Sequence, residues 1–263
     1  MRKVFYIVVL SLFVFSAYGQ NSGSLKFLGI PVDGTKAQFV TALKAKGFYY
    51  SSLSEGYKGQ FNGKDVDVYV HTNHNLVDRV YVAFPSTTEE GIRTEFNRLL
   101  EQFQNTGKYL ALTVNEKIPA EEDISYEITV NNKRYQASFC YFDPERDPVA
   151  LTHDFMDKFS DFFTEEQIAK MKEFATRLMD VPVDQREGLQ AEMLAEMQMM
   201  GYGQDENTEP DPEKSLKFLI TFIDGASSLA DGNVWFMIHH NYGRYNVGLY
   251  YDNLHNQAHG EDL

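Results

Sequence analysis

The chain has a single cysteine, Cys140, among its 263 residues. One cysteine excludes an internal disulfide, so the stability of the fold must come from an ordinary apolar core. It also excludes the paired cysteines of redox motifs and zinc ribbons. Because Cys140 lies in an apolar and aromatic stretch, we expect it to be a small buried side chain rather than a nucleophile.

Common catalytic motifs are missing as well. The sequence contains no Gly-x-Ser-x-Gly, no His-Glu-x-x-His and no phosphate-binding glycine loop. Positive charge is scarce, since 24 Lys and Arg stand against 38 Asp and Glu and give a formal net charge of −14. A negative protein repels phosphate backbones and anionic lipid, so we expect neither nucleic acid nor a membrane surface as a partner.

The N-terminus has the pattern of a secretory signal peptide. Two basic residues, Arg2 and Lys3, precede an apolar run over 4–15, and the small residues Ala17 and Gly19 follow two positions apart. The apolar run is shorter than the roughly 20 residues that a membrane span needs. No cysteine follows the run, which disfavours a lipoprotein. We therefore expect residues 1–19 to be removed and the mature protein to be periplasmic or extracellular, without membrane insertion.

The first part of the mature chain, residues 20–110, predicts an α-β-β-β-α unit. A capping box at Thr35 and a glycine at position 47 delimit the first helix. The pair Asn62-Gly63 favours a two-residue hairpin turn, because both turn positions need positive φ. The alternating valines after this turn predict a strand with one buried face. Apolar residues at helical spacing predict a second helix over 88–105.

The remainder, residues 111–263, predicts a second α+β unit with a helical insertion. We expect a hairpin over 124–142, helices within about 155–200, and an exposed acidic loop over 201–213. The chain closes with a hairpin over 234–251, whose strands are rich in valine and aromatic residues.

Residues 212–230 fit two periodicities. Phe218, Ile220 and Phe222 alternate as in a strand, whereas Asp211-Pro212 offers an N-cap and a first-turn proline for a helix. We expect the helix. The fold class is then α+β, an antiparallel sheet built from β-hairpins and a meander, with flanking helices and an inserted helical hairpin. Whether the chain holds two related α/β halves stays open.

Several stretches of the mature chain carry a family resemblance. They are Phe27-Leu28-Gly29-Ile30-Pro31-Val32-Asp33-Gly34-Thr35, Leu43-Lys44-Ala45-Lys46-Gly47-Phe48, Ile124-Ser125-Tyr126-Glu127, Asn131-Asn132-Lys133-Arg134-Tyr135, Tyr250-Tyr251-Asp252-Asn253 and Gly260-Glu261-Asp262-Leu263. In these stretches the chain resembles a family of uncharacterised exported proteins of gut Bacteroidales. The resemblance implies export and a single inherited architecture, and it implies no activity.

The histidines are the first side chains to consider for chemistry. His239 and His240 are neighbours in a predicted strand, so they point to opposite faces and cannot share one metal ion. Either of them with a nearby carboxylate would make a hydrolase site. His255 and His259 have the four-residue spacing of a helical zinc pair. The polar tail around them is a poor helix former, so we expect a solvated tail and no metal site.

A methionine stripe lies in the predicted helical insertion. Met193, Met197 and Met200 share one helix face. Thioethers suit copper(I), which would fit periplasmic metal handling. Methionine is also a flexible core filler, and packing against the core or a partner is the favoured interpretation. We treat the three as candidate binding residues and expect no cofactor.

Polar and aromatic side chains on the predicted solvent faces of strands are the other candidates for binding. They are Tyr69 and His71 on one strand and Tyr245 on another, and tyrosine is common in recognition surfaces. Export without a catalytic motif predicts a non-enzymatic binding or protein-interaction protein. Its partner would be a protein or a small molecule, and its ligand and oligomeric state stay open. The alternatives are a periplasmic hydrolase using His239 or His240, and metal handling by Met and His.

Overall fold

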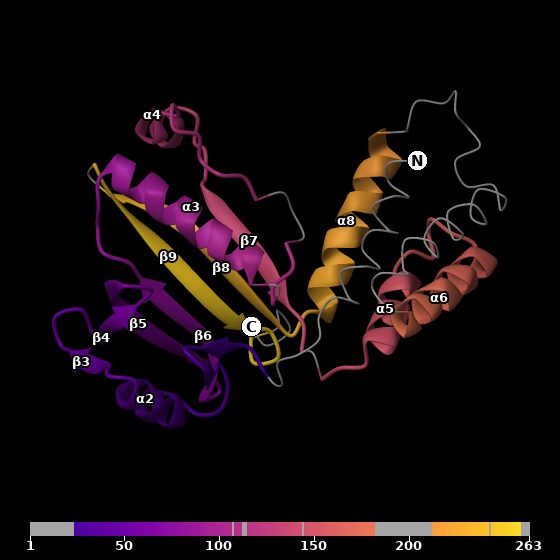
Figure 1. The fold of residues 1–263 in the computed structure, drawn as a ribbon, viewed down its shortest axis with the longest axis horizontal. Helices are drawn as coiled ribbons and strands as arrows, with labels where there is room; N and C mark the ends of the chain where they lie inside the picture. The colour runs from indigo at the N-terminus through magenta and orange to yellow at the C-terminus, as the bar shows by residue number, and fades with distance from the viewer. Residues whose placement is uncertain are drawn as a thin grey trace. The chain divides into compact units, whose positions relative to one another are not determined.

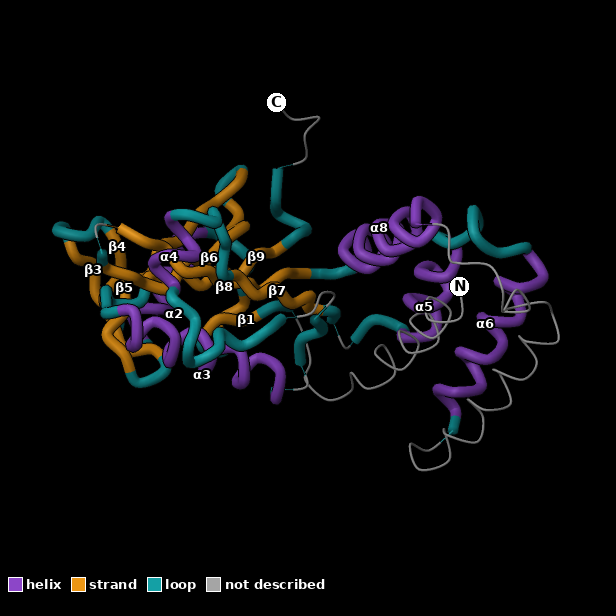
Figure 2. Tube along the Cα trace, turned by 90° about the horizontal axis from the view of Figure 1, so that it is seen from above, coloured by secondary structure: helices purple, strands orange, loops and turns teal. Residues whose placement is uncertain are grey.

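The computed structural model describes residues 24–106, 108–111, 115–143, 145–181, 212–241 and 243–258. The chain divides into two compact units. The sheet unit comprises residues 22–143 and 230–263, and the helical unit comprises residues 144–229, which interrupt it in sequence. Figure 2 shows that the strands belong to the sheet unit, while the described part of the helical unit is helix and loop. The α+β class predicted from the sequence is confirmed.

The sheet unit is built on one antiparallel sheet (Figure 1). The first four strands of this sheet form a meander. The last hairpin of the chain joins the meander because the second strand of the hairpin pairs with β6 (Leu76–Ala83). Strands from both of the segments that the sequence suggests, residues 20–110 and 111–263, therefore belong to the same sheet. In spatial order the seven strands are β3 (Tyr49–Ser51), β4 (Gly56–Phe61), β5 (Lys64–Asn73), β6 (Leu76–Ala83), β9 (Arg244–Asn253), β8 (Gly232–Asn241) and β7 (Gln136–Tyr141).

The predicted hairpin turn between β4 and β5 is confirmed. Asn62 and Gly63 have φ values of 53° and 74°, as a turn whose two central residues are both left-handed requires. Phe61 pairs with Lys64 across this turn, which sets the register of the two strands. A separate small hairpin, β1 (Lys26–Phe27) and β2 (Ile30–Pro31), precedes the sheet in sequence.

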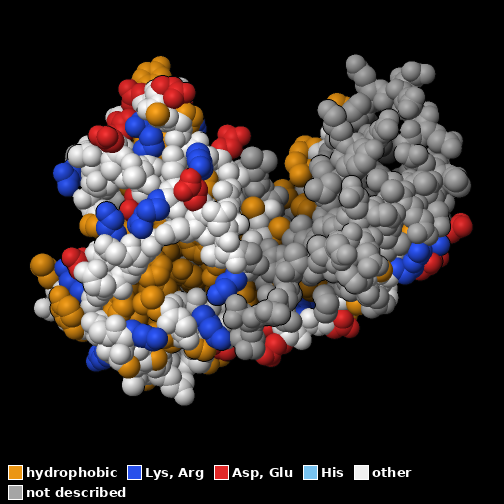
Figure 3. Space-filling model, in the orientation of Figure 1, with side chains coloured by type: hydrophobic (Ala, Val, Ile, Leu, Met, Phe, Trp, Pro, Cys, Tyr) orange, Lys and Arg blue, Asp and Glu red, His pale blue; other side chains and the backbone are white. Residues whose placement is uncertain are grey.

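Two helices cover one face of the sheet, which we call the core face. The helix α2 (Lys36–Ala45) begins with the predicted capping box at Thr35, and α3 (Glu89–Asn105) begins at the N-cap Thr88. Contacts join α2 to β5 and β6, and α3 to β8 and β9. Figure 3 shows the side that carries these helices, with apolar side chains visible between them.

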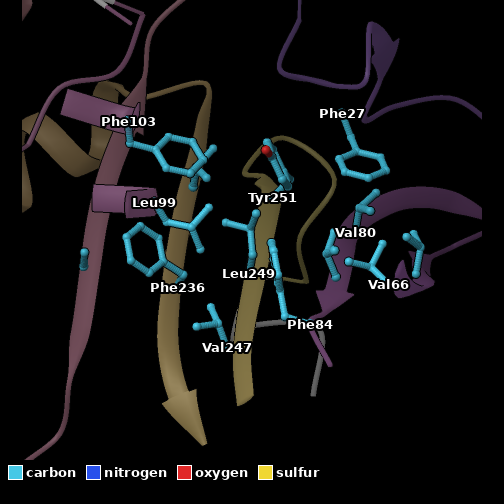
Figure 4. Close-up of a cluster of buried hydrophobic side chains, with 14 of the residues drawn as sticks. Phe27, Val66, Val80, Phe84, Leu99, Phe103, Phe236, Val247, Leu249 and Tyr251 are labelled. Atoms are coloured by element: carbon cyan, nitrogen blue, oxygen red, sulfur yellow. The ribbon is translucent and has the colours of Figure 1, made fainter. Parts of the chain in front are cut away.

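Alternating residues of each central strand supply the core. On β5 the valines at 66, 68 and 70 are buried, as predicted, and the residues between them are half-buried or exposed. Figure 4 shows Phe236 of β8 beside Leu99 of α3 and Leu249 of β9. The other face of the sheet, which we call the open face, carries the alternate positions. Its residues on β8 and on the N-terminal half of β5 are mostly half-buried.

The hairpin predicted over 124–142 is wrong in its first half. Residues Ile124–Thr129 form a short helix, α4, and only β7 follows as a strand, paired with β8. The Asp123 side chain accepts a hydrogen bond from the Tyr126 N–H and caps this helix. Ile124 and Ile128 are four residues apart, a spacing that suits one helical face as well as a strand, and the cap decides between them.

Glu122, next to α4, gives a pH-dependent prediction. Hydrogen bonds from Lys133 and from the Tyr135 hydroxyl lower the pKa of its carboxyl below the usual 4.5. A depressed carboxyl pKa adds stability above pH 4.5 that is lost as the pH falls through the folded-state pKa. We expect Glu122→Gln to cost about 1 kcal/mol near neutral pH, because two charge-assisted bonds weaken. Urea unfolding at several pH values should show that the difference in free energy of unfolding between variant and wild type becomes smaller below pH 4.5. A constant gap would contradict this.

The helical unit has a core of phenylalanine rings. Phe159 lies at its centre, 1% exposed, with Phe155 and Phe218 about equally close at 5.1 and 5.0 Å between ring centroids. Its described helices are α5 (Pro148–Asp157), α6 (Glu165–Asp180) and α8 (Pro212–Leu229).

Two sequence predictions for this unit can be compared with the structure. The helices expected within 155–200 include α6, which begins with a capping box at Thr164, and the choice of helix over strand for 212–230 is confirmed by α8. The predicted methionine helix and nearly all of the acidic loop, residues 182–211, lie outside the described residues.

Candidate functional site

Four aromatic side chains form a row across the open face of the sheet unit. Tyr69 of β5 lies directly opposite Tyr81 of β6. Tyr81 in turn lies opposite Tyr250 of β9, and Tyr250 lies opposite Trp235 of β8. Directly opposite residues of antiparallel strands are close enough for their side chains to interact. We call these four residues the aromatic ladder.

The ladder rings are stacked almost parallel to one another. Ring centroids are 5.5 Å apart between Tyr69 and Tyr81, with an interplanar angle of 20°. The separation is 4.7 Å at 16° between Tyr81 and Tyr250, and 3.8 Å at 6° between Tyr250 and Trp235. Because the rings stack along the row, they stand on the sheet with their edges toward solvent. All four are half-buried.

A charged pair fixes the Trp235 end of the ladder. Arg79 donates from Nε and Nη2 to the two oxygens of Asp252, at 2.5 and 2.9 Å. The Trp235 Nε1–H donates to Oδ2 of the same carboxylate at 2.9 Å. The Arg79 guanidinium carbon also lies 5.7 Å from the ring centroids of both Trp235 and Tyr250, within the range of a cation–π contact. Asp252 is only 4% exposed, so these donors satisfy a buried charge.

The ladder is electrically neutral at neutral pH. Burial, followed by the neighbouring tyrosine hydroxyls, raises the pKa of Tyr81 to about 12. Burial is also the main cause that raises the pKa of Tyr69 and of Tyr250. His239, whose Nε2 is 3.2 Å from the Tyr250 hydroxyl, has its pKa lowered by burial. The tyrosine hydroxyls therefore stay protonated, and the imidazole stays uncharged.

Two glycines give the ladder rings their space. A Cβ at Gly56 would lie 2.9 Å from Cε1 of Tyr69. A Cβ at Gly248 would lie 2.6 Å from the His239 Nε2 and 2.9 Å from Cε2 of Tyr81. All three distances are too short for real Cβ contacts, so neither position accepts a side chain without displacing the rings.

Gly248→Ala is therefore expected to disturb the ladder. We expect a loss of about 1–3 kcal/mol in the free energy of unfolding, since Tyr81 or His239 must move. Gly225→Ala is the matched control, because the nearest atom there is 3.4 Å away and alanine favours the helix α8. Chemical denaturation of both variants provides the measurement. Equal stabilities for Gly248→Ala and wild type would show that the ladder is not tightly packed.

The ladder includes one of the residues predicted from sequence. Tyr69 is its first ring, and the exposed His71 lies on the same strand face, opposite Arg79. The placement of Tyr245 on a solvent face is wrong, because it is 3% exposed and stacks on His240 at 4.8 Å. Apolar and aromatic residues occur at both odd and even positions of β9. The alternation of residue types along this strand therefore did not reveal which of its faces is buried. Met193, Met197 and Met200 lie outside the described residues.

The other ladder residues were missed, and so was the charged pair. Tyr81, Tyr250 and Trp235 each lie on a strand that the sequence predicts. What brings them together is the pairing of β6 with β9, and no local pattern in the sequence specifies that pairing. The signal that could have found them is an aromatic residue at a half-buried position of each strand, which becomes informative only once the strand order is known.

Among the described residues, His239 and His240 of the hydrolase alternative have no carboxylate partner. The His239 imidazole contacts the Tyr250 hydroxyl and ring, and His240 Nε2 accepts the Gly243 N–H at 3.2 Å. Within the described residues, the histidine that does have a carboxylate partner is His255. Its Nε2 is 2.9 Å from Oδ1 of Asp231, and the other oxygen of Asp231 accepts the Asp143 N–H at 2.6 Å.

Neither a metal centre nor a membrane span is found within the described part of the chain. Among the described residues, no group of three or more His, Cys, Asp and Glu side chains could hold a metal ion. Over the same residues, no helix has the length and apolar character needed to cross a membrane. No family model, curated protein or solved structure matches this chain. The resemblance to exported Bacteroidales proteins stays a prediction.

Proposed function

We propose that this chain is an exported, non-enzymatic binding protein that uses the aromatic ladder as its recognition surface. The observation that carries the proposal is the in-register row of three tyrosines and one tryptophan, with Arg79 beside it. Tyr, Trp and Arg are the residue types that dominate binding energy at recognition surfaces. The helices α2 and α3 pack on the core face and leave this row on the opposite face.

The rigidity of the ladder supports the same proposal. Each interior ring is held between two neighbours, and Trp235 is fixed by its hydrogen bond to Asp252. Side chains that are already ordered lose little conformational entropy when a ligand binds. A preorganised row of this kind favours binding without any chemical step.

The hydrolase alternative has less support. Neither His239 nor His240 has a carboxylate partner among the described residues. The pair His255 and Asp231 has suitable geometry for a general base, but the His255 side chain is 68% exposed on the chain's polar tail. The methionines of the metal-handling alternative, Met193, Met197 and Met200, lie outside the described part of the chain. Absence of copper or zinc from the purified protein by elemental analysis would remove that alternative.

A ligand array tests the binding proposal. The mature protein would be applied to immobilised glycans and peptides together with two variants, Tyr250→Ala and Tyr126→Ala. Tyr126 lies on α4 and is 53% exposed, so its loss is the control for removing a surface tyrosine. We expect ligands that wild type and Tyr126→Ala retain and Tyr250→Ala loses. Retention of every ligand by a folded Tyr250→Ala would contradict the proposal.

A further inference from the structure

Among the described residues, the stacking within the ladder leaves one ring face free of any aromatic partner. Tyr81 and Tyr250 have neighbours on both faces, and the outer face of Tyr69 covers Gly56. Trp235 stacks on Tyr250 with one face only. Its other face points along the row toward β7, where Ser138 is its directly opposite residue. Ser138 is exposed, and its short side chain cannot cover an indole ring.

Polar groups surround this free indole face. The next residue of β7 on the same face is Gln136, which is also exposed and lies opposite Met237. The backbone at Ser138 is held in place by Asn115, whose Nδ2 donates to the Ser138 carbonyl and whose Oδ1 accepts the Ser138 N–H, at 3.0 and 3.2 Å. A flat apolar platform therefore lies beside the serine hydroxyl, carried on a fixed backbone, and beside the side-chain amide of Gln136.

Two basic side chains beside the ladder already have acidic partners. Arg79 is neutralised by Asp252, and Lys58 lies 3.9 Å from Asp67 on the same face. A ligand carboxylate or phosphate would have to compete with Asp252 for Arg79. A ligand cation near the Trp235 end would meet the positive Arg79 guanidinium, whose carbon lies 5.7 Å from the ring centroids of both Trp235 and Tyr250. The chemistry of the face therefore favours an uncharged ligand.

The remaining groups offer hydrogen bonds to hydroxyls. The edges of Tyr69, Tyr81 and Tyr250 carry phenolic hydroxyls, which already have protein partners such as Ser54 and His239. Because a phenolic hydroxyl both donates and accepts, each can form a further hydrogen bond to a ligand. A sugar ring has an apolar C–H face, which can stack on an indole. It also has a rim of hydroxyls, which can form hydrogen bonds. Building on the proposed function, we infer that Trp235 and Ser138 form a stacking subsite for one ring of a neutral saccharide.

The test follows the emission of Trp235, the only tryptophan in the chain. The mature protein would be titrated with two neutral polysaccharides, laminarin and galactomannan, with the acidic polysaccharide polygalacturonate, and with a mixed-sequence peptide pool. We expect at least one neutral polysaccharide to shift the emission and the acidic one to leave it unchanged. Ser138→Leu fills the space beside the indole and should weaken saccharide binding by about tenfold or more. Tyr126→Ala should bind as wild type does.

The outcomes separate this inference from the proposed function. If only peptides shift the emission, and Tyr250→Ala abolishes that shift, the binding proposal stands and the saccharide inference falls. If a neutral polysaccharide binds Ser138→Leu as tightly as wild type, the subsite is elsewhere and the inference is overturned. If none of the probes alters Trp235 emission, the inference is overturned as well. A thermal melt of Ser138→Leu, an exposed substitution expected to fold normally, accompanies each titration.

Discussion

Phe236→Ala is expected to lower the free energy of unfolding of the sheet unit by about 3–5 kcal/mol. Phe236 is fully buried, and its ring centroid lies 5.1 Å from that of Phe96 and 5.8 Å from that of Phe103, both on α3. Phe139 of β7 is 6.4 Å away on another side. Removing the ring leaves a cavity between the sheet and its main helix, which neighbouring side chains can fill only in part.

Denaturant unfolding followed by Trp235 emission measures this effect, because Trp235 is the neighbouring strand residue. Leu53→Ala is the control, since Leu53 is 91% exposed and its loss should change stability by no more than about 0.5 kcal/mol. A cost for Phe236→Ala of the same size as this control would mean that α3 does not pack on β8 as described.

Asp252→Ala is expected to cost about 2–3 kcal/mol and to disorder the Trp235 end of the ladder. The substitution leaves the Arg79 guanidinium and the Trp235 N–H without their common acceptor. Breaking a buried ion pair usually costs about 3–5 kcal/mol, and we expect less here because the Arg79 side chain is 37% exposed and can reach water. The Trp235 emission should also shift, since its hydrogen bond is lost.

The matched control for Asp252→Ala is Lys58→Ala. Lys58 belongs to an ion pair on the same face, but that pair is 3.9 Å long and more exposed, so its loss should cost no more than about 1 kcal/mol. Comparing the two separates a buried, shared carboxylate from an ordinary surface charge. Equal effects from the two substitutions would show that Asp252 does not organise the ladder.

Local sequence signals predicted the local parts of this fold. Thr35 begins its helix because side-chain capping depends on residues three positions apart. Asn62-Gly63 forms its turn because only left-handed backbone fits there. The strand β5 buries its valines because alternation along one strand needs no knowledge of its neighbours.

What the sequence did not predict depends on contacts between distant segments. The ladder exists because β9 pairs with β6, which places Tyr250 next to Tyr81. That pairing also decides which set of alternate residues on β9 faces the core, and so it accounts for the wrong placement of Tyr245 on a solvent face. The helix α4 was missed for a different reason. A six-residue segment whose apolar residues are Ile124, Tyr126 and Ile128 fits a strand or a helix equally well, and a single cap at Asp123 selects the helix.

Acrylamide quenching of Trp235 in the folded mature protein tests most directly whether the ladder is a surface that a ligand can reach. The structure predicts quenching intermediate between that of a free indole and that of a core residue, and it predicts protection once a ligand from the array is bound. Two results would contradict the assignment of this face as the recognition surface. One is Trp235 emission that acrylamide does not quench in the free protein, and the other is quenching that a bound ligand leaves unchanged.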